Sequence, residues 1–326
     1  MPTLPAIPWL PVLTAAGGFL AALGFMAGRE WNRRLVLKRV LSRRPVGSDG
    51  VVPGAHTVSR PGGVARGALV LHGYADTPQS VVALCDALAR AGYAVEAPLL
   101  PGHGRTLASL DRATERQWIA EARAAWLAMR SRHGTCVLVG QSMGGALAVL
   151  LAAEAPPAAL VLAAPYVSAT QAIARAVRWS RLWGLWMPYV ETADPRSIRD
   201  PEALIASRGY GAATAKSMRA LHRLMTLARA ALPRVSCPTM LVQSPDDNRV
   251  SAAGAEWAFA RLGAAATALV GRPGAGHVVL ADRGRDAGRA AAVQWCQRFA
   301  GPARPGGKSG DEPGGASRGR PVRLTS

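Results

Sequence analysis

Residues 136–155, CVLVGQSMGGALAVLLAAEA, contain an apolar run, a turn around a serine and a helical pattern in direct succession. CVLV predicts a buried strand, and GALAVLLAAEA predicts a helix. Between them lies Gly140-Gln141-Ser142-Met143-Gly144, a G-x-S-x-G pattern. A serine at such a bend adopts a strained backbone, needs small neighbours and has its hydroxyl exposed above the sheet. Ser142 is therefore the candidate nucleophile. The Met143 N–H is a candidate oxyanion donor because it opens the helix.

The predicted strand before Ser142 and the predicted helix after it matter because G-x-S-x-G also arises by chance. The alternative interpretation is an ordinary strand–turn–helix corner with an incidental serine.

Beyond this stretch, short apolar runs alternate with longer helical patterns, which predicts an α/β fold whose parallel sheet has helices on both faces. The predicted strands are 68–71, 94–97, 136–139, 160–163, 240–243 and 266–270, and the predicted helices are 79–91, 114–132, 144–154 and 285–299.

One segment, 168–232, breaks this alternation because it has helical patterns and an aromatic cluster but no strand candidate. We interpret it as a helical cap inserted between two strands of a core that comprises 50–167 and 233–300. Its Leu182, Trp183, Leu185 and Trp186 could line an apolar acyl slot or simply pack the cap onto the core.

Two further residues have the chemistry that activates a serine. His277, in GRPGAGHVVL, follows the last predicted strand and is the candidate general base. Asp246 and Asp247, in MLVQSPDDNRV, follow another strand and compete for the role of the acid that orients this base. Asp247 is preferred because Val250 lies three residues further on, in a D-x-x-V spacing. The alternative for either acid is a solvated loop residue that caps the next helix.

A second oxyanion donor is expected from the loop after the strand ALVL, where His72-Gly73-Tyr74 follows. The Tyr74 N–H is the candidate, since a hydrolase needs donors placed where negative charge develops on the substrate oxygen. An ordinary glycine turn is the alternative interpretation. His72 and His103 are expected to be structural.

Composition narrows the function classes. The chain has 326 residues and a formal net charge of +19, from 39 basic and 20 acidic side chains. About half of the excess positive charge lies in the two flanking segments 29–44 and 301–326. The remainder is spread singly without an aromatic-interleaved patch, so no nucleic-acid partner is expected. Its four cysteines form no metal-ligand spacing, so neither a metal nor a cofactor is expected.

The termini lie outside this core. Residues 7–28 carry no charge and are followed by the basic stretch REWNRRLVLKRVLSRR. This order predicts a transmembrane anchor over 1–28 and a basic linker over 29–49, with the catalytic domain on the cytoplasmic side of the membrane. A cleaved signal peptide or a peripheral segment is the alternative. The tail 301–326, rich in Gly, Pro, Ser and Arg, is expected to be disordered.

The segments LHGY, APLLPGHG, GQSMGG, LVQSPDD and GAGHVV, in this order, resemble the α/β-hydrolase superfamily, and within it the bacterial carboxylesterase and monoacylglycerol lipase branch. The resemblance implies an eight-stranded, mostly parallel sheet with a small helical cap. It also implies ester hydrolysis through an acyl-enzyme, with Ser142, Asp247 and His277 as the triad and Tyr74 and Met143 as the oxyanion donors. Pro245 departs from the family pattern, which weakens the choice between the two aspartates.

The same triad would serve an acyltransferase or a thioesterase. A catalytically silent scaffold on this fold is the third interpretation. In each enzymatic reading, the substrate is a small or lipid-derived acyl compound.

Overall fold

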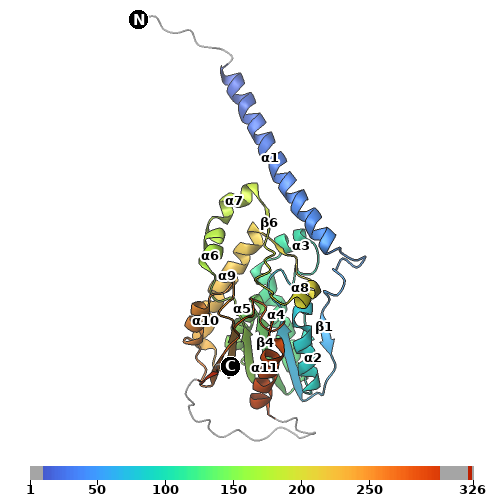
Figure 1. The fold of residues 1–326 in the computed structure, drawn as a ribbon, viewed down its shortest axis with the longest axis vertical. Helices are drawn as coiled ribbons and strands as arrows, with labels where there is room; N and C mark the ends of the chain where they lie inside the picture. The colour runs from blue at the N-terminus through green and yellow to red at the C-terminus, as the bar shows by residue number, and fades with distance from the viewer. Residues whose placement is uncertain (1–9, 302–321, 325–326) are drawn as a thin grey trace, which may run out of the picture.

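A computed structural model describes residues 10–301 and 322–324 of the chain (Figure 1). Its main sheet has eight strands in the order β1-β3-β2-β4-β5-β8-β9-β10, in which β1 is antiparallel to β3 and the other pairs are parallel. The strands are β1 (Val58–Arg60), β2 (Arg66–Leu71), β3 (Ala94–Ala97), β4 (Thr135–Gln141), β5 (Ala159–Ala163), β8 (Thr239–Gln243), β9 (Thr267–Gly271) and β10 (Val322–Leu324). The expectation of a mostly parallel α/β sheet is confirmed.

Helices cover both faces of this sheet because successive strand residues point to opposite sides. On β2, Leu69 and Leu71 pack into one apolar cluster, whereas Ala68 and Val70 pack into another. The first cluster includes residues of α4 (Glu115–Arg132), α5 (Met143–Glu154) and α10 (Ala252–Phe259). The second includes residues of α2 (Val82–Arg90) and α11 (Arg285–Ala300).

The chain between β5 and β8 forms a separate group of elements beyond the carboxyl edge of the sheet (Figure 1). It comprises α6 (Gln171–Arg178), α7 (Ser180–Trp186), β6 (Tyr189–Glu191), α8 (Pro201–Ala206), β7 (Ala212–Thr214), α9 (Ala215–Ala231) and the 3-10 turn η2 (Leu232–Arg234). The expectation that this segment contains helices alone is wrong, because β6 and β7 pair as an antiparallel ribbon. Three-residue strands are too short to show the alternation by which strands are recognised.

Along α7, the side chains of Leu182, Leu185 and Trp186 are 58%, 51% and 61% exposed. This exposure argues against the interpretation in which these three residues pack the segment onto the core. Trp183 differs from them, because it is partly buried and its indole N–H donates to the Ala176 carbonyl at 2.7 Å.

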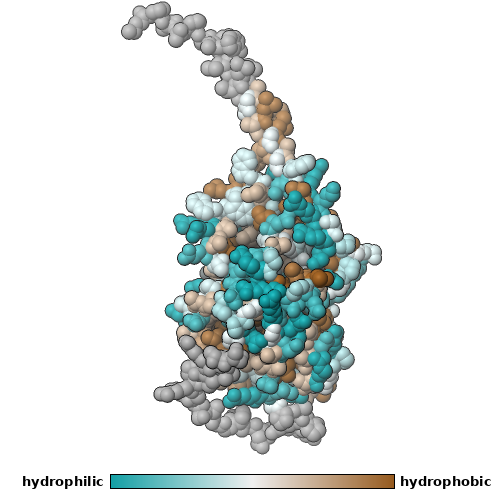
Figure 2. Space-filling view, viewed as in Figure 1, coloured by the Kyte–Doolittle hydropathy of each residue, from teal (hydrophilic) through white to brown (hydrophobic). Residues whose placement is uncertain are grey.

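Helix α1 (Leu10–Arg43) contacts the body of the protein through its C-terminal half and extends away from it at its N-terminal end (Figure 1). Val36 and Val40 are buried in the first apolar cluster. Arg29 donates to the Gly184 and Leu185 carbonyls at the end of α7, at 3.1 and 2.8 Å. Figure 2 shows apolar side chains on the extended part of the helix.

The prediction of a transmembrane helix over 1–28 is wrong. Among residues 10–301 and 322–324, no helix has an apolar stretch long enough to cross a bilayer. The absence of charge in 7–28 was a misleading signal, because glycine and alanine contribute little apolar surface and Arg29 begins the basic stretch. The predicted location on the cytoplasmic face of a membrane depended on this span and is overturned with it.

Two terminal predictions concern residues that are only partly described. Residues 1–9, 302–321 and 325–326 lie outside the described part of the chain, and most of the tail prediction falls on them. Residues 322–324 are described, and they pair with β9 at the edge of the main sheet.

Candidate active site

Ser142 lies at a strained bend between β4 and α5. Its φ of 54° and ψ of −112° are unusual for a residue with a side chain. The bend requires glycine on both sides, because a Cβ on Gly140 would lie 2.3 Å from the Gly144 carbonyl oxygen. A Cβ on Gly144 would lie 2.1 Å from the carbonyl oxygen of Leu71 on β2. The two glycines of the G-x-S-x-G pattern therefore let the turn pack tightly against the neighbouring strand.

His277 comes from the loop after β9 and reaches the serine. Its Nε2 lies 2.7 Å from the Ser142 Oγ, and its Nδ1 lies 2.8 Å from the Asp247 Oδ2. A carboxylate only accepts hydrogen bonds, so Nδ1 carries the proton and Nε2 is free to accept the serine proton. The Gln141 side chain donates to the His277 carbonyl at 3.1 Å, which holds the histidine backbone beside the serine.

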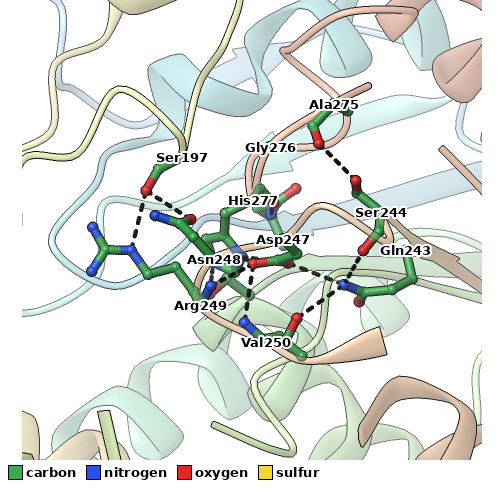
Figure 3. A network of polar contacts seen from close by, with 12 residues as sticks. Ser197, Gln243, Ser244, Asp247, Asn248, Arg249, Val250, Ala275, Gly276 and His277 are labelled. Carbon is green, nitrogen blue, oxygen red and sulfur yellow. Dashed lines mark hydrogen bonds and ion pairs between the residues drawn. The ribbon is translucent and has the colours of Figure 1, made fainter. Parts of the chain in front are cut away.

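Asp247 is the acid that contacts His277 (Figure 3). Its Oδ1 accepts hydrogen bonds from the Arg249 and Val250 N–H groups at 2.7 and 3.0 Å, and its Oδ2 accepts one from the Gln243 amide at 3.1 Å. Burial acts to raise the pKa of Asp247, but His277 and the Val250 and Arg249 N–H groups outweigh it and hold the pKa below the usual value. The carboxylate is therefore ionised wherever His277 has to act as a base.

Asp246, the competing acid, faces a different part of the same loops. Its carboxylate accepts from the Gly274 N–H at 2.9 Å and lies 3.6 Å from the Arg199 guanidinium. It supports the loop that carries His277 without contacting the imidazole. The D-x-x-V spacing has a physical explanation here, because the Val250 N–H is one of the donors to Asp247.

The two expected oxyanion donors come from backbone next to Ser142. Met143 is the first residue of α5, and a Cβ on Gly73 would lie 3.5 Å from the Ser142 Cβ. The backbone that leads into Tyr74 therefore runs beside the serine. The Tyr74 hydroxyl bonds to the Ser217 Oγ at 2.6 Å, at the start of α9. This contact between the loop and the insertion has no signal in the sequence.

His72 and His103 are buried histidines that contact neighbouring backbone. The His72 Nε2 accepts a hydrogen bond from the Leu100 N–H at 3.1 Å, so its Nδ1 is protonated and donates to the Gly73 carbonyl. Burial lowers the pKa of His72 to about 3 and that of His103 to about 4, so both stay neutral. Their expected structural role agrees with these contacts.

Asp76, which sequence reasoning missed, is a partly buried acid whose carboxylate accepts a hydrogen bond from the Thr77 N–H at 2.9 Å. Burial raises the pKa of Asp76 to about 6, against the donors Ser80 and Thr77 and the charge of His277, which lower it. Its signal in the sequence was an acid two residues after Tyr74, in the loop expected to supply an oxyanion donor.

Replacing Asp76 with asparagine is expected to stabilise the protein at pH 8. The folded-state pKa of about 6 exceeds the ordinary value of 3.8, so the stability linked to the protonated acid is present below pH 4 and is lost as pH rises through 6. The gain in unfolding free energy should reach about 1–3 kcal/mol at pH 8. Urea unfolding at pH 5 and 8 measures the difference in unfolding free energy between the variant and the wild type. Glu121→Gln, on the exposed side of α4, is the control. An equal loss of stability at both pH values would contradict this account.

Among the described residues, no group of three or more His, Cys, Asp or Glu side chains is arranged to hold a metal ion. The four cysteines are buried and unpaired.

A strained serine above the carboxyl edge of a mostly parallel sheet, in contact with a histidine that contacts a buried aspartate, defines a serine hydrolase of the α/β-hydrolase fold. Residues 64–284 match the model of the serine aminopeptidase S33 family, and the chain belongs to this family.

The chain also resembles individual lipolytic enzymes. It is 28% identical over 216 residues to the thermostable monoacylglycerol lipase of Bacillus sp. (strain H-257). The aligned region covers 66% of this chain and 84% of that protein. One of the metagenome-derived lipolytic enzymes LipS and LipT superposes with a TM-score of 0.68 at 25% identity, covering 76% of this chain and 99% of the other. The monoacylglycerol lipase of Paleococcus ferrophilus superposes with a TM-score of 0.64 at 18% identity. The match covers 75% of this chain and 98% of the lipase.

Proposed function

We propose that this protein hydrolyses carboxylic esters of the acylglycerol type through an acyl-enzyme on Ser142. The observation that carries the proposal is the unbroken chain of hydrogen bonds from Ser142 through His277 to Asp247, with heavy-atom distances of 2.7 and 2.8 Å. The similarity to lipolytic enzymes supports an ester as the substrate.

The reaction has two steps in this geometry. His277 accepts the Ser142 proton through Nε2 while the serine oxygen attacks the ester carbonyl, and the Tyr74 and Met143 N–H groups stabilise the oxyanion. The imidazolium then protonates the leaving alcohol, which departs and leaves the acyl group on the serine. Water, deprotonated by the same imidazole, attacks the acyl carbonyl. The bond to the Ser142 oxygen then breaks, the imidazolium returns its proton to that oxygen, and the acid is released.

The segment 168–232 serves in this proposal as the cap over the catalytic core of 50–167 and 233–300. Two contacts support this role, because the Tyr74 hydroxyl bonds to Ser217 of α9 and the Tyr210 N–H donates to the Ala75 carbonyl at 2.9 Å. These two hydrogen bonds join the loop that carries Tyr74 to the cap. Apolar residues of the cap would accept the acyl chain of the substrate.

The test compares p-nitrophenyl esters of increasing acyl length, 1-monoacylglycerols and aminoacyl p-nitroanilides. We expect turnover of the esters with release of free acid, and little turnover of the anilides. The anilides are included because they are substrates for an aminopeptidase, the activity after which the S33 family is named. Turnover confined to the anilides, or no turnover by protein that a fluorophosphonate labels, would contradict the proposal. Added alcohol acceptors separate a hydrolase from an acyltransferase, because acyl transfer gives a new ester in place of the acid.

A further inference from the structure

Asp282, five residues after His277, is a completely buried carboxylate surrounded by backbone N–H groups. Its Oδ1 accepts from Asp200, Arg283 and Arg199 at 2.7, 2.8 and 2.9 Å. Its Oδ2 accepts from Gly276 at 2.6 Å and from Arg199 at 2.9 Å. Both oxygens act only as acceptors, which a carboxylate satisfies and an amide does not. These contacts join the loop that carries the base to residues 199–200 of the insertion.

The insertion also contacts the backbone on both sides of His277. A Cβ on Gly276 would lie 2.3 Å from the Arg196 carbonyl oxygen, so glycine is needed for the two segments to meet. On the other side, the Val278 N–H donates to the Ser197 carbonyl at 3.1 Å. We call residues 194–200 the strap, because this segment lies across the base loop from one side of His277 to the other.

The strap contacts the loop of the acid as well (Figure 3). The Ser197 hydroxyl donates to the Asn248 Oδ1 at 3.1 Å and accepts from the Arg249 Nε at 3.1 Å. Asn248 in turn donates to the Asp194 carboxylate at 3.0 Å. One segment of the insertion therefore holds the residues on both sides of the contact between His277 and Asp247.

We infer that Asp282 is a positioning residue of the reaction. Its buried carboxylate binds the Gly276 N–H and the strap at the same time, and this fixes the position of the His277 imidazole. The inference rests on the proposed function, because it assigns Asp282 a role in activating Ser142. In Asp282→Asn, one oxygen becomes an NH₂ group that faces at least one backbone N–H. The base loop and the strap then separate, and His277 shifts relative to the serine.

The test measures turnover per active site. Sites in Asp282→Asn and wild-type protein are first counted by complete labelling with a fluorophosphonate, and kcat and KM for a p-nitrophenyl ester are then expressed per labelled site. A displacement of about 1 Å lowers turnover by ~100-fold, so we expect a fall of that order in kcat with KM nearly unchanged. A purely structural role would reduce the number of sites and leave turnover per site as in the wild type, and that result would overturn the inference.

Asp200→Asn is the matched control. Its carboxylate caps α8 and pairs with Arg285 at 2.7 Å, on the same strap, but it makes no contact with Gly276. We expect this variant to give at most a smaller number of labelled sites. Its kcat per labelled site should equal that of the wild type. A loss in this control as large as that in Asp282→Asn would assign the effect to general loosening of the strap and overturn the inference.

Asp282→Glu covers the case in which the asparagine variant gives no labelled sites. It keeps both acceptor oxygens and displaces them by one methylene, so the expected result is a folded protein with a lower kcat per site. Wild-type turnover per site in this variant would overturn the inference.

The rate of fluorophosphonate labelling separates this inference from the proposed function. If wild-type protein is labelled but cleaves no ester, the ester assignment fails while Asp282 is still tested, because activation of Ser142 sets the labelling rate. Labelling of Asp282→Asn at the wild-type rate would reject the positioning role whatever the substrate.

Discussion

The Ser142→Ala protein is expected to lose ester hydrolysis by about 10⁶-fold in kcat while remaining folded. The hydroxyl is the atom that forms the acyl-enzyme, and no other hydroxyl contacts the His277 Nε2 among the described residues. The mutation removes only an oxygen, and alanine is compatible with the small space at the bend. Fluorophosphonate labelling and p-nitrophenyl ester turnover measure the two consequences.

The control for this result is Ser131→Ala on α4, where the hydroxyl donates to the Ala128 carbonyl on the surface of the protein. It should be labelled and should turn over substrate like the wild type. Residual labelling of Ser142→Ala at the wild-type rate would place the nucleophile elsewhere and remove the basis of the proposed function.

Asp247→Asn is expected to lower kcat/KM by about 10⁴-fold, whereas Asp246→Asn should change it by less than about threefold. An asparagine at 247 can present its NH₂ group to Nδ1. The imidazole proton then moves to Nε2, the atom 2.7 Å from the Ser142 Oγ. A protonated Nε2 cannot accept the serine proton, so the base is held in the wrong tautomer.

Asp246→Asn loses a partly exposed ion pair with Arg199, and such pairs contribute at most about 1 kcal/mol to stability. The amide oxygen can still accept the Gly274 N–H. Steady-state kinetics on both variants, with circular dichroism as the check of folding, decides between the two acids. A larger loss in Asp246→Asn than in Asp247→Asn would reverse the assignment.

Much of the fold was accessible from the sequence because its signals are local. The run CVLV, the two glycines around Ser142 and the helix after them each depend on neighbours within a few residues. The same is true of the alternating strands and helices, and of the loops after β2, β8 and β9 in which Tyr74, Asp247 and His277 lie. The carboxyl ends of parallel strands share one edge of a sheet, so these residues were expected to meet there.

The N-terminal prediction failed for a related reason. A stretch without charge resembles a membrane span in its local pattern, but the stretch contributes too little apolar surface to satisfy the requirement. The β6–β7 ribbon was missed because pairing of two three-residue strands is specified by partners that lie 20 or more residues apart.

By itself, the sequence determined the class of fold, the candidate nucleophile at its strained turn and the order in which the three candidate catalytic residues follow one another. Only the tertiary structure decided which aspartate contacts His277, tied Tyr74 to Ser217 and brought the strap onto the buried carboxylate of Asp282. The physical reason is range. Backbone preferences act over a few residues, whereas a hydrogen bond between distant loops forms only after the order β4-β5-β8-β9 has brought the ends of those strands together.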